Sequence, residues 1–168
     1  MQVEVVVVGG GPAGSAAAVT LARGGRSVLV VDKAHFPRDK CCGDGLTTMA
    51  LRLGKHLGLD PEPLADWQPV GSAVVHSPSG RTVRFPLPSG GGSYAAVVPR
   101  TSYDAALLDL ARSAGAEVRE GCSFTSIRPS GDGAELMVEG LGEVRTSNVV
   151  AADGMWSPVR RALGLPER

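Results

Sequence analysis

Four glycines and an aspartate near the N-terminus have the types and spacing of a dinucleotide-binding motif. The apolar segment Val3–Val8 leads into the turn Gly9–Gly14, and a second apolar segment, Val28–Val31, ends at Asp32. In such a turn the glycines allow a sharp strand-to-helix reversal, close approach of the backbone to a pyrophosphate, and tight packing of helix on strand. The N–H groups at the start of the following helix face the anion. The motif therefore predicts a nucleotide site.

The position of Asp32 supports this interpretation. It lies 21 residues after Gly11, at the predicted tip of the second strand, where a carboxylate accepts hydrogen bonds from ribose hydroxyls and repels a 2′-phosphate. The alternative is a glycine-rich turn without a ligand, but the strand before it, the helix after it and the acid at this distance favour the nucleotide site. Pro12 within the motif is more typical of FAD proteins than of NAD dehydrogenases, and the chain has no second motif of this kind.

The composition indicates a globular domain and excludes several classes of protein. The chain has 168 residues, 43% of them hydrophobic, which is enough for one domain with a core. It has 17 basic and 17 acidic residues, so its net charge gives no electrostatic argument for nucleic acid as a partner. No run reaches the roughly 18 apolar residues of a membrane span. Because no basic segment precedes the first apolar run, we expect a cytoplasmic protein without a signal peptide.

The cysteines and histidines do not form a metal-binding pattern. Three cysteines give no disulfide framework and no paired spacing for zinc, and the three histidines lie far apart in the sequence. We therefore expect no metal, and we expect the histidines on the surface or in loops. These residues are Cys41, Cys42, Cys122, His35, His56 and His76.

The apolar pattern predicts an α/β fold, a doubly wound and mostly parallel sheet of Rossmann type with insertions. An amphipathic helix is expected over Leu46–Leu57, and a capping box of Thr101 and Asp104 begins a helix that Gly115 stops. A strand over Glu117–Glu120 adds to the sheet. Three short antiparallel strands and a separate buried strand then follow. These four are Phe124–Ile127, Glu135–Glu139, Glu143–Thr146 and Asn148–Ala152.

The middle of the chain departs from this pattern. Residues 61–93 are rich in proline and glycine, and within them Ala73–His76 and Thr82–Phe85 flank a Pro-Ser-Gly turn as a predicted hairpin. We expect residues 1–60 and 94–168 to form the nucleotide-binding domain. Residues 61–93 are expected to belong to the sheet of a second, substrate-binding domain.

A second loop, His35–Leu46, carries a further motif. Its Gly-x-Gly unit, Gly43–Gly45, precedes a helix and offers backbone N–H groups to an anion or to the edge of a flavin ring. Together with Gly9–Gly14, this loop strongly resembles the geranylgeranyl reductase family of FAD-dependent oxidoreductases, within the class that includes flavin hydroxylases. The family carries a Cys-Gly-x-Gly unit at the position of Cys42–Gly45.

Three more matches extend the resemblance along the chain. Pro99-Arg100 is similar to the family's arginine that reaches the FAD phosphate or ribityl region, Asp153-Gly154 is similar to the family's Asp-Gly motif, and Phe124 falls where members contact the adenine end through the backbone. Read alone, Arg100 is also compatible with a solvated charge, Asp153-Gly154 with a turn, and Cys42 with a small buried hydrophobe. The residues expected to bind FAD are Gly9, Gly11, Pro12, Ala13, Gly14, Asp32, Lys33, Cys42, Gly43, Asp44, Gly45, Arg100, Phe124, Asp153 and Gly154.

The resemblance implies reduction of isolated C=C bonds in a polyprenyl lipid or prenylquinone tail, with hydride from reduced FAD. The partner is then a hydrophobic small molecule, and the resemblance leaves open both the electron donor and a peripheral contact with a membrane. The alternatives are a flavin hydroxylase or halogenase, and a non-catalytic FAD-binding module completed by a partner chain. An NAD-only dehydrogenase ranks last.

The resemblance also exposes a difference in length. Family members are much longer, and after the matched region they carry a Gly-Asp-Ala-Ala type motif and most of the substrate-binding sheet. We therefore expect an N-terminal fragment or a chain completed by another. No catalytic residue is assigned from the sequence.

Overall fold

The structure, a computed structural model, describes residues 1–88 and 94–166 and divides into two compact units. Unit 1 comprises Met1–Arg38 and Asp104–Arg168, and unit 2 comprises Asp39–Tyr103. The boundary at residues 103 and 104 falls within one helix, α3 (Arg100–Ser113). No helix in the described ranges is both long and apolar enough to cross a membrane.

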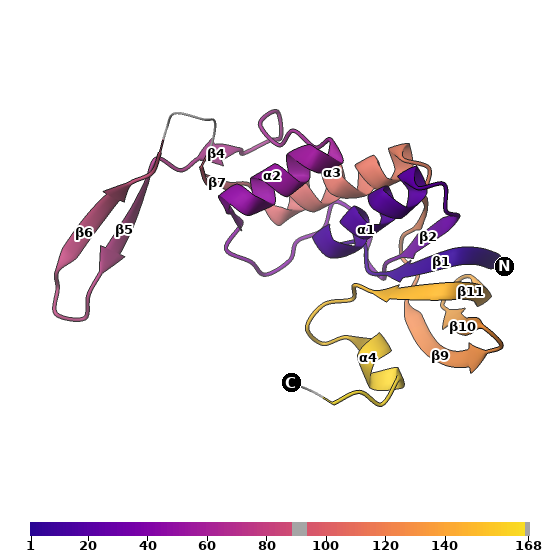
Figure 1. Cartoon of the computed structure of the whole chain (residues 1–168). Coiled ribbons are helices and arrows are strands. Elements are labelled where there is room, and N and C mark those ends of the chain that lie inside the picture. Colours follow the sequence, from indigo (N-terminus) through magenta and orange to yellow (C-terminus); the bar gives the residue numbers. More distant parts are fainter. Residues whose placement is uncertain (89–93, 167–168) are drawn as a thin grey trace. The chain divides into compact units, whose positions relative to one another are not determined.

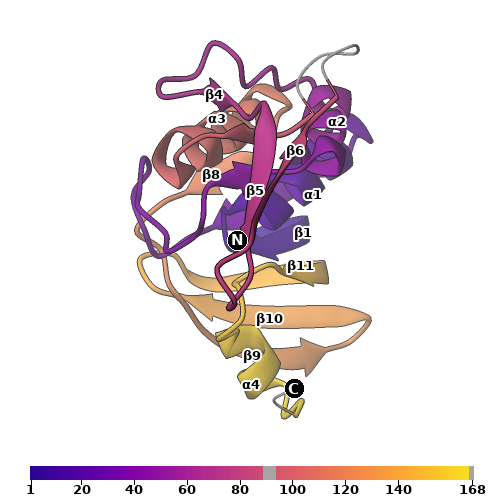
Figure 2. The ribbon, with the colours of Figure 1, turned by 90° about the vertical axis from the view of Figure 1, so that its left-hand side faces the viewer.

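Unit 1 is built on a six-stranded sheet with the order β8-β2-β1-β11-β10-β9 (Figures 1 and 2). The first four of these strands are parallel to one another, and β10 and β9 continue the sheet in antiparallel fashion. The predicted α/β class is therefore confirmed. The strands are β1 (Gln2–Val8), β2 (Val28–Val31), β8 (Glu117–Arg119), β9 (Phe124–Ser130), β10 (Gly133–Val138) and β11 (Gly142–Ala151).

The centre of this sheet is covered on both faces. Helix α1 (Pro12–Arg23) packs on the face that bears Val7, and Val159 of α4 (Pro158–Ala162) packs on the other face in a cluster with Val6 and Val8. Residues 5–8 of β1 and all of β2 are buried. This explains why these strands read as continuous valine-rich runs rather than as alternating ones.

The C-terminal strands differ from the sequence prediction. Glu143–Thr146 and Asn148–Ala152, predicted as separate strands, form one continuous strand, β11. Its first part, residues 142–146, pairs with β10, and residues 145–151 pair with β1. Figures 1 and 2 show β9, β10 and β11 side by side. The prediction that residues 148–152 are buried is also wrong, because α1 packs mainly against β1 and β2 and leaves this part of β11 half-exposed.

Unit 2 contains one complete helix, a small sheet and a hairpin. Helix α2 (Thr48–Leu57) begins two residues later than predicted, because Gly45 and Leu46 pair with β7 as a short strand. The Thr47 hydroxyl caps its start, and Gly58, with φ 89°, ends it. The small sheet has the order β3-β7-β4. Its strands are β3 (Gly45–Leu46), β4 (Gln68–Pro69) and β7 (Ala96–Val97).

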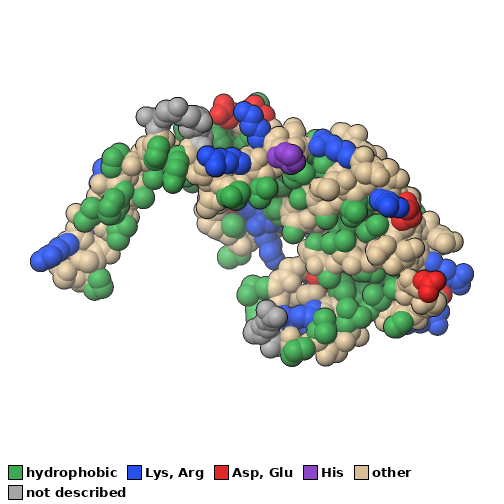
Figure 3. All heavy atoms as spheres, in the orientation of Figure 1, with side chains coloured by type: hydrophobic (Ala, Val, Ile, Leu, Met, Phe, Trp, Pro, Cys, Tyr) green, Lys and Arg blue, Asp and Glu red, His purple; other side chains and the backbone are tan. Residues whose placement is uncertain are grey.

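The predicted hairpin is confirmed as β5 (Ser72–His76) and β6 (Thr82–Pro86). Its antiparallel register pairs Val75 with Val83, so these two side chains share one face. Both are at least half exposed, and hydrophobic side chains are visible along this hairpin in the space-filling view (Figure 3).

The capping box predicted for α3 is wrong. The helix begins at Arg100, so Thr101 lies inside it, and the buried Asp104 carboxylate pairs with Arg38. The carboxylate of Asp44 takes the capping role, because its Oδ1 accepts a hydrogen bond from the Arg100 N–H at 3.3 Å.

Candidate cofactor site

The glycine turn of unit 1 depends on the absence of side chains. Gly9 has φ 103°, and its N–H donates to the Val31 carbonyl at 2.8 Å, which ties the turn to the end of β2. A Cβ on Gly9 would lie 2.4 Å from the Ala152 carbonyl oxygen, and a Cβ on Gly14 would lie 1.8 Å from the Gly9 carbonyl oxygen. Backbone therefore occupies the space on both sides of the turn, which requires glycine at these two positions.

The start of α1 is suited to an anion. Gly11 is the N-cap and supplies no side-chain hydrogen bond, Pro12 occupies the first helical turn, and that turn contains no acidic residue. The first four N–H groups of a helix have no partner within it. Because Pro12 has no N–H, three such groups remain at the start of α1, and the helix dipole adds positive potential there. This end of α1 therefore fits the pyrophosphate of a dinucleotide.

Asp32 has a structural role that sequence reasoning missed. Its Oδ2 accepts the Gly10 N–H at 2.7 Å, and its Oδ1 accepts the Ala34 N–H at 2.8 Å. Each carboxylate oxygen accepts two hydrogen bonds, so acceptor capacity remains for ribose hydroxyls. The same carboxylate thus holds the glycine turn. Its contact with a ribose stays a prediction.

The Asp-Gly motif lies beside the glycine turn. A Cβ on Gly9 would be 3.0 Å from the backbone nitrogen of Asp153 as well as close to Ala152. Asp153 Oδ2 accepts the Val159 N–H at 2.9 Å and so fixes the start of α4, while Gly154 turns the chain with φ 88°. The structure therefore brings two predicted site residues to the glycine turn, although the Asp153 carboxylate already binds a backbone group.

The loop that follows Asp32 is held by two acids far away in the sequence. Glu120 Oε2 accepts the Phe36 N–H at 2.9 Å, and Asp104 pairs with Arg38 at 3.0 Å. Burial raises the pKa of Glu120, but the Phe36 N–H and the Arg112 guanidinium outweigh it and hold this pKa below its ordinary value. Both acids keep the loop in place, and the sequence contained no local signal for either contact.

Two other predicted residues of unit 1 have weaker structural support. Lys33 is exposed on the loop after β2. The Phe124 side chain packs half-buried against the cluster that contains Leu136 and Val138. The structure thus accounts for Phe124 as a packing residue, and its backbone contact with adenine stays a prediction.

Unit 2 brings Cys42, Asp44 and Arg100 together. Asp44 has φ 54°, in the left-handed region that few non-glycine residues adopt, and the Val98 N–H donates to its carbonyl oxygen at 3.0 Å. Hydrogen bonds from the Asp44 N–H and then from the Arg100 side chain hold the pKa of the Cys42 thiol below its ordinary value. A Cβ on Gly43 would meet nothing within 4 Å, so the loop is open to a ligand there.

This arrangement predicts a reactive thiol. In the FAD-free protein, we expect Cys42 to react with iodoacetamide faster than its neighbour Cys41 near neutral pH, because a lowered pKa increases the fraction of thiolate. The Arg100→Gln variant should shift the pH–rate profile of Cys42 to higher pH. Arg81→Gln, which removes one positive charge from the hairpin turn, serves as the control. Peptide mass spectrometry measures both rates, and superimposable profiles for Arg100→Gln and the natural protein would contradict this assignment.

Comparison with known proteins shows what this chain is similar to. The profile of the FAD binding domain family matches residues 2–168. The chain is 38% identical to the menaquinone reductase of Mycolicibacterium smegmatis over 97% of its length, and 36% identical to the digeranylgeranylglycerophospholipid reductase of Methanosarcina mazei over 96%. It spans 40% of the length of each of these relatives.

A solved structure supports the same relationship. The geranylgeranyl bacteriochlorophyll reductase-like protein from Thermoplasma acidophilum superimposes on this chain with a TM-score of 0.84 at 29% identity. The superposition covers 98% of this chain and 42% of the Thermoplasma chain. The predicted resemblance to geranylgeranyl reductases is therefore confirmed, as is FAD as the cofactor. The glycine turn at the start of α1 and the family profile both indicate a dinucleotide cofactor. The chain belongs to the FAD binding domain family.

Proposed function

We propose that this chain is the FAD-binding part of an oxidoreductase that reduces C=C bonds in the prenyl chain of a lipid or quinone. The observation that carries the proposal is its similarity to two prenyl-lipid and quinone reductases at 36–38% identity over nearly the whole chain. The exposed Cys42 thiol, held by Asp44 and Arg100, supports the reductase over the hydroxylase alternative, because the reductases carry the Cys-Gly-x-Gly unit.

The proposal assigns separate tasks to the two units. In unit 1, the start of α1 binds the pyrophosphate and Asp32 accepts the ribose hydroxyls. In unit 2, the N–H groups of the Gly-x-Gly segment in Cys42–Gly45 are assigned to the edge of the flavin ring. The Arg100 guanidinium is assigned to the phosphate or ribityl region of FAD. When bound and reduced, FAD supplies the hydride. The protein's residues orient the cofactor, and Lys33 adds a positive charge next to Asp32.

Product analysis tests the proposed activity. The natural holoenzyme that contains this chain, with whatever segment or partner chain completes it, is loaded with FAD and reduced anaerobically with dithionite. It is then mixed with an unsaturated prenylquinone or a geranylgeranyl phospholipid. We expect products whose mass has risen by two hydrogens for each double bond that is reduced. Protein stripped of FAD is the control and should give none.

Two outcomes would contradict the proposal. The first is an unchanged prenyl chain in the presence of fully reduced, protein-bound FAD. The second is a hydroxylated or halogenated product that forms only when oxygen is admitted, which would assign the chain to the alternative class.

A further inference from the structure

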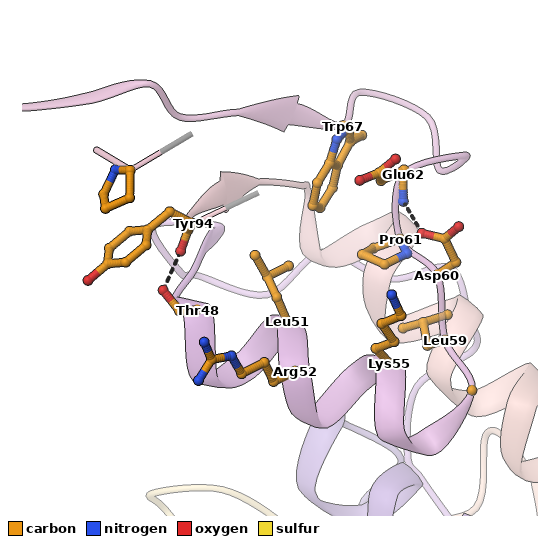
Figure 4. A pocket seen from close by; sticks show the side chains of 12 residues that line it. Thr48, Leu51, Arg52, Lys55, Leu59, Asp60, Pro61, Glu62, Trp67 and Tyr94 are labelled. Atoms are coloured by element: carbon orange, nitrogen blue, oxygen red, sulfur yellow. Dashed lines mark hydrogen bonds between the residues drawn. The ribbon is translucent and has the colours of Figure 1, made fainter. Parts of the chain in front are cut away.

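Unit 2 contains a pocket that the cofactor residues do not use. Its volume is about 710 Å³, within the range of roughly 300–1,000 Å³ typical of small-molecule sites. One wall is the face of α2 that bears Leu51 and Lys55, and Trp67 points toward Leu51 from the opposite side (Figure 4). The apolar lining residues are Leu51, Leu59, Pro61, Trp67, Pro88 and Tyr94.

Hydrogen bonds to backbone carbonyl oxygens hold the segments that surround the pocket. The Thr48 hydroxyl donates to the Tyr94 carbonyl at 2.6 Å, which joins the segment of Tyr94 to the start of α2. On the other side, the Leu59 N–H donates to the Gly54 carbonyl at 2.9 Å and the Trp67 N–H donates to the Leu64 carbonyl at 3.3 Å. These hydrogen bonds restrain the walls, which lowers the conformational entropy that is lost when a ligand binds.

The charges of the lining select a neutral ligand that accepts hydrogen bonds. Arg52 and Lys55 line the pocket, and in the described part of the chain neither forms an ion pair within 4.0 Å. Asp60 and Glu62 also line it, so the two positive and two negative charges balance. Because these charges balance, the lining gives no net attraction to a phosphate group. A flat carbonyl compound fits better, since Trp67 and Tyr94 offer aromatic faces and the two cations offer donors.

The pocket lies next to the loop proposed for the flavin end. Thr48, at one edge of the pocket, follows Leu46 of β3 by two residues, and β3 directly continues the Cys42–Gly45 loop. A ring bound in the pocket could therefore extend an attached chain toward this loop within the same unit.

We propose that this pocket binds the quinone ring of a prenylquinone substrate. The inference rests on the proposed function and adds the identity of the head group to it. The ring lies between the apolar residues of α2 and the Trp67 side chain, and Arg52 and Lys55 donate hydrogen bonds to its carbonyl oxygens.

Tryptophan fluorescence tests the site directly, without turnover. The chain has two tryptophans, so in the FAD-loaded Trp156→Phe variant Trp67 reports alone. We expect saturable quenching by menadione, a naphthoquinone without a prenyl tail. In this background, Arg52→Gln and Lys55→Gln should each raise the Kd about three- to tenfold, the loss of one net hydrogen bond. Arg81→Gln, with the same charge change outside the pocket, should leave the Kd unchanged.

Other results would overturn the inference. Quenching that does not saturate, or that is equal in Arg52→Gln, Lys55→Gln and Arg81→Gln, places menadione elsewhere. Displacement of menadione by glycerol phosphate at similar concentration assigns the pocket to a phosphate head group. The product assay separates the two proposals: prenyl reduction without menadione binding contradicts only the pocket, and menadione binding without prenyl reduction contradicts only the proposed activity.

Discussion

The Gly14→Ala variant is expected to lose the folded glycine turn of unit 1 and, with it, FAD binding. The added Cβ would lie 1.8 Å from the Gly9 carbonyl oxygen and 3.2 Å from Cγ1 of Val7. The first contact is with backbone, and Gly9 is itself held by its hydrogen bond to Val31, so α1 must move away from the sheet. Overpacking costs about 1–3 kcal/mol in unfolding free energy, and a backbone clash this short belongs at the upper end.

Urea unfolding and flavin fluorescence measure the two effects. Gly71→Ala is the matched control, because a Cβ there meets nothing within 4 Å and its backbone does not have positive φ. We expect a lower midpoint of unfolding and no detectable FAD binding for Gly14→Ala, with the control unchanged in both. Natural stability and affinity in Gly14→Ala would show that α1 tolerates the shift and that the close approach is not required.

The parallel part of the fold was predictable because its signals are local and redundant. Val5–Val8 and Val28–Val31 are apolar at every position, as expected for strands buried on both faces. The turn between them has glycines at the positions where the backbone leaves no room. The hairpin in unit 2 was predictable for a similar reason, since two short strand-like runs flank a Pro-Ser-Gly turn whose Gly80 has positive φ.

The path of β11 was not predictable from local sequence. Thr146, Ser147 and Asn148 form a polar run that is typical of a turn. In the structure, the buried Thr146 hydroxyl lies 3.0 Å from the Glu4 carbonyl oxygen and 2.9 Å from the Asn148 carbonyl oxygen, which satisfies it inside a strand. The strand continues because β1, from Gln2 to Val8, provides backbone partners for residues 145–151 of β11. The extended conformation at Thr146 therefore depends on a contact with Glu4, which lies 142 positions away in the sequence.

The site shows the same division between near and distant contacts. The motif at Gly9–Gly14 and the position of Asp32 follow from spacing, whereas the contacts that hold the surrounding loops join residues far apart. Asp44 caps α3 across 56 positions, and Glu120 binds the Phe36 N–H across 84. The capping-box pattern predicted Thr101 as the cap rather than Asp44, because that pattern considers only residues close together in the sequence.

The Asp32→Ala variant should weaken FAD binding by about 2–4 kcal/mol, or roughly 30- to 1,000-fold in Kd. Two losses add. The ribose hydroxyls lose a charged acceptor, and the Gly10 N–H, which donates to Asp32 Oδ2 at 2.7 Å, loses its partner beside the pyrophosphate position. Asp32→Asn should fall between the natural protein and Asp32→Ala, because the amide oxygen can still accept one of the two backbone N–H groups.

Comparing stability with affinity separates these two roles of Asp32. Without FAD, the unfolding free energy reports only the support that the carboxylate gives to Gly10 and Ala34, and we expect it to fall in the order natural protein, Asp32→Asn, Asp32→Ala. The FAD titration by flavin fluorescence adds the ribose contact, so the loss of affinity should exceed the loss of stability. Asp132→Ala, which removes an exposed acid from a turn of unit 1, should change neither. An unchanged Kd in Asp32→Ala would remove Asp32 from the ribose site and leave it only the role of holding the turn.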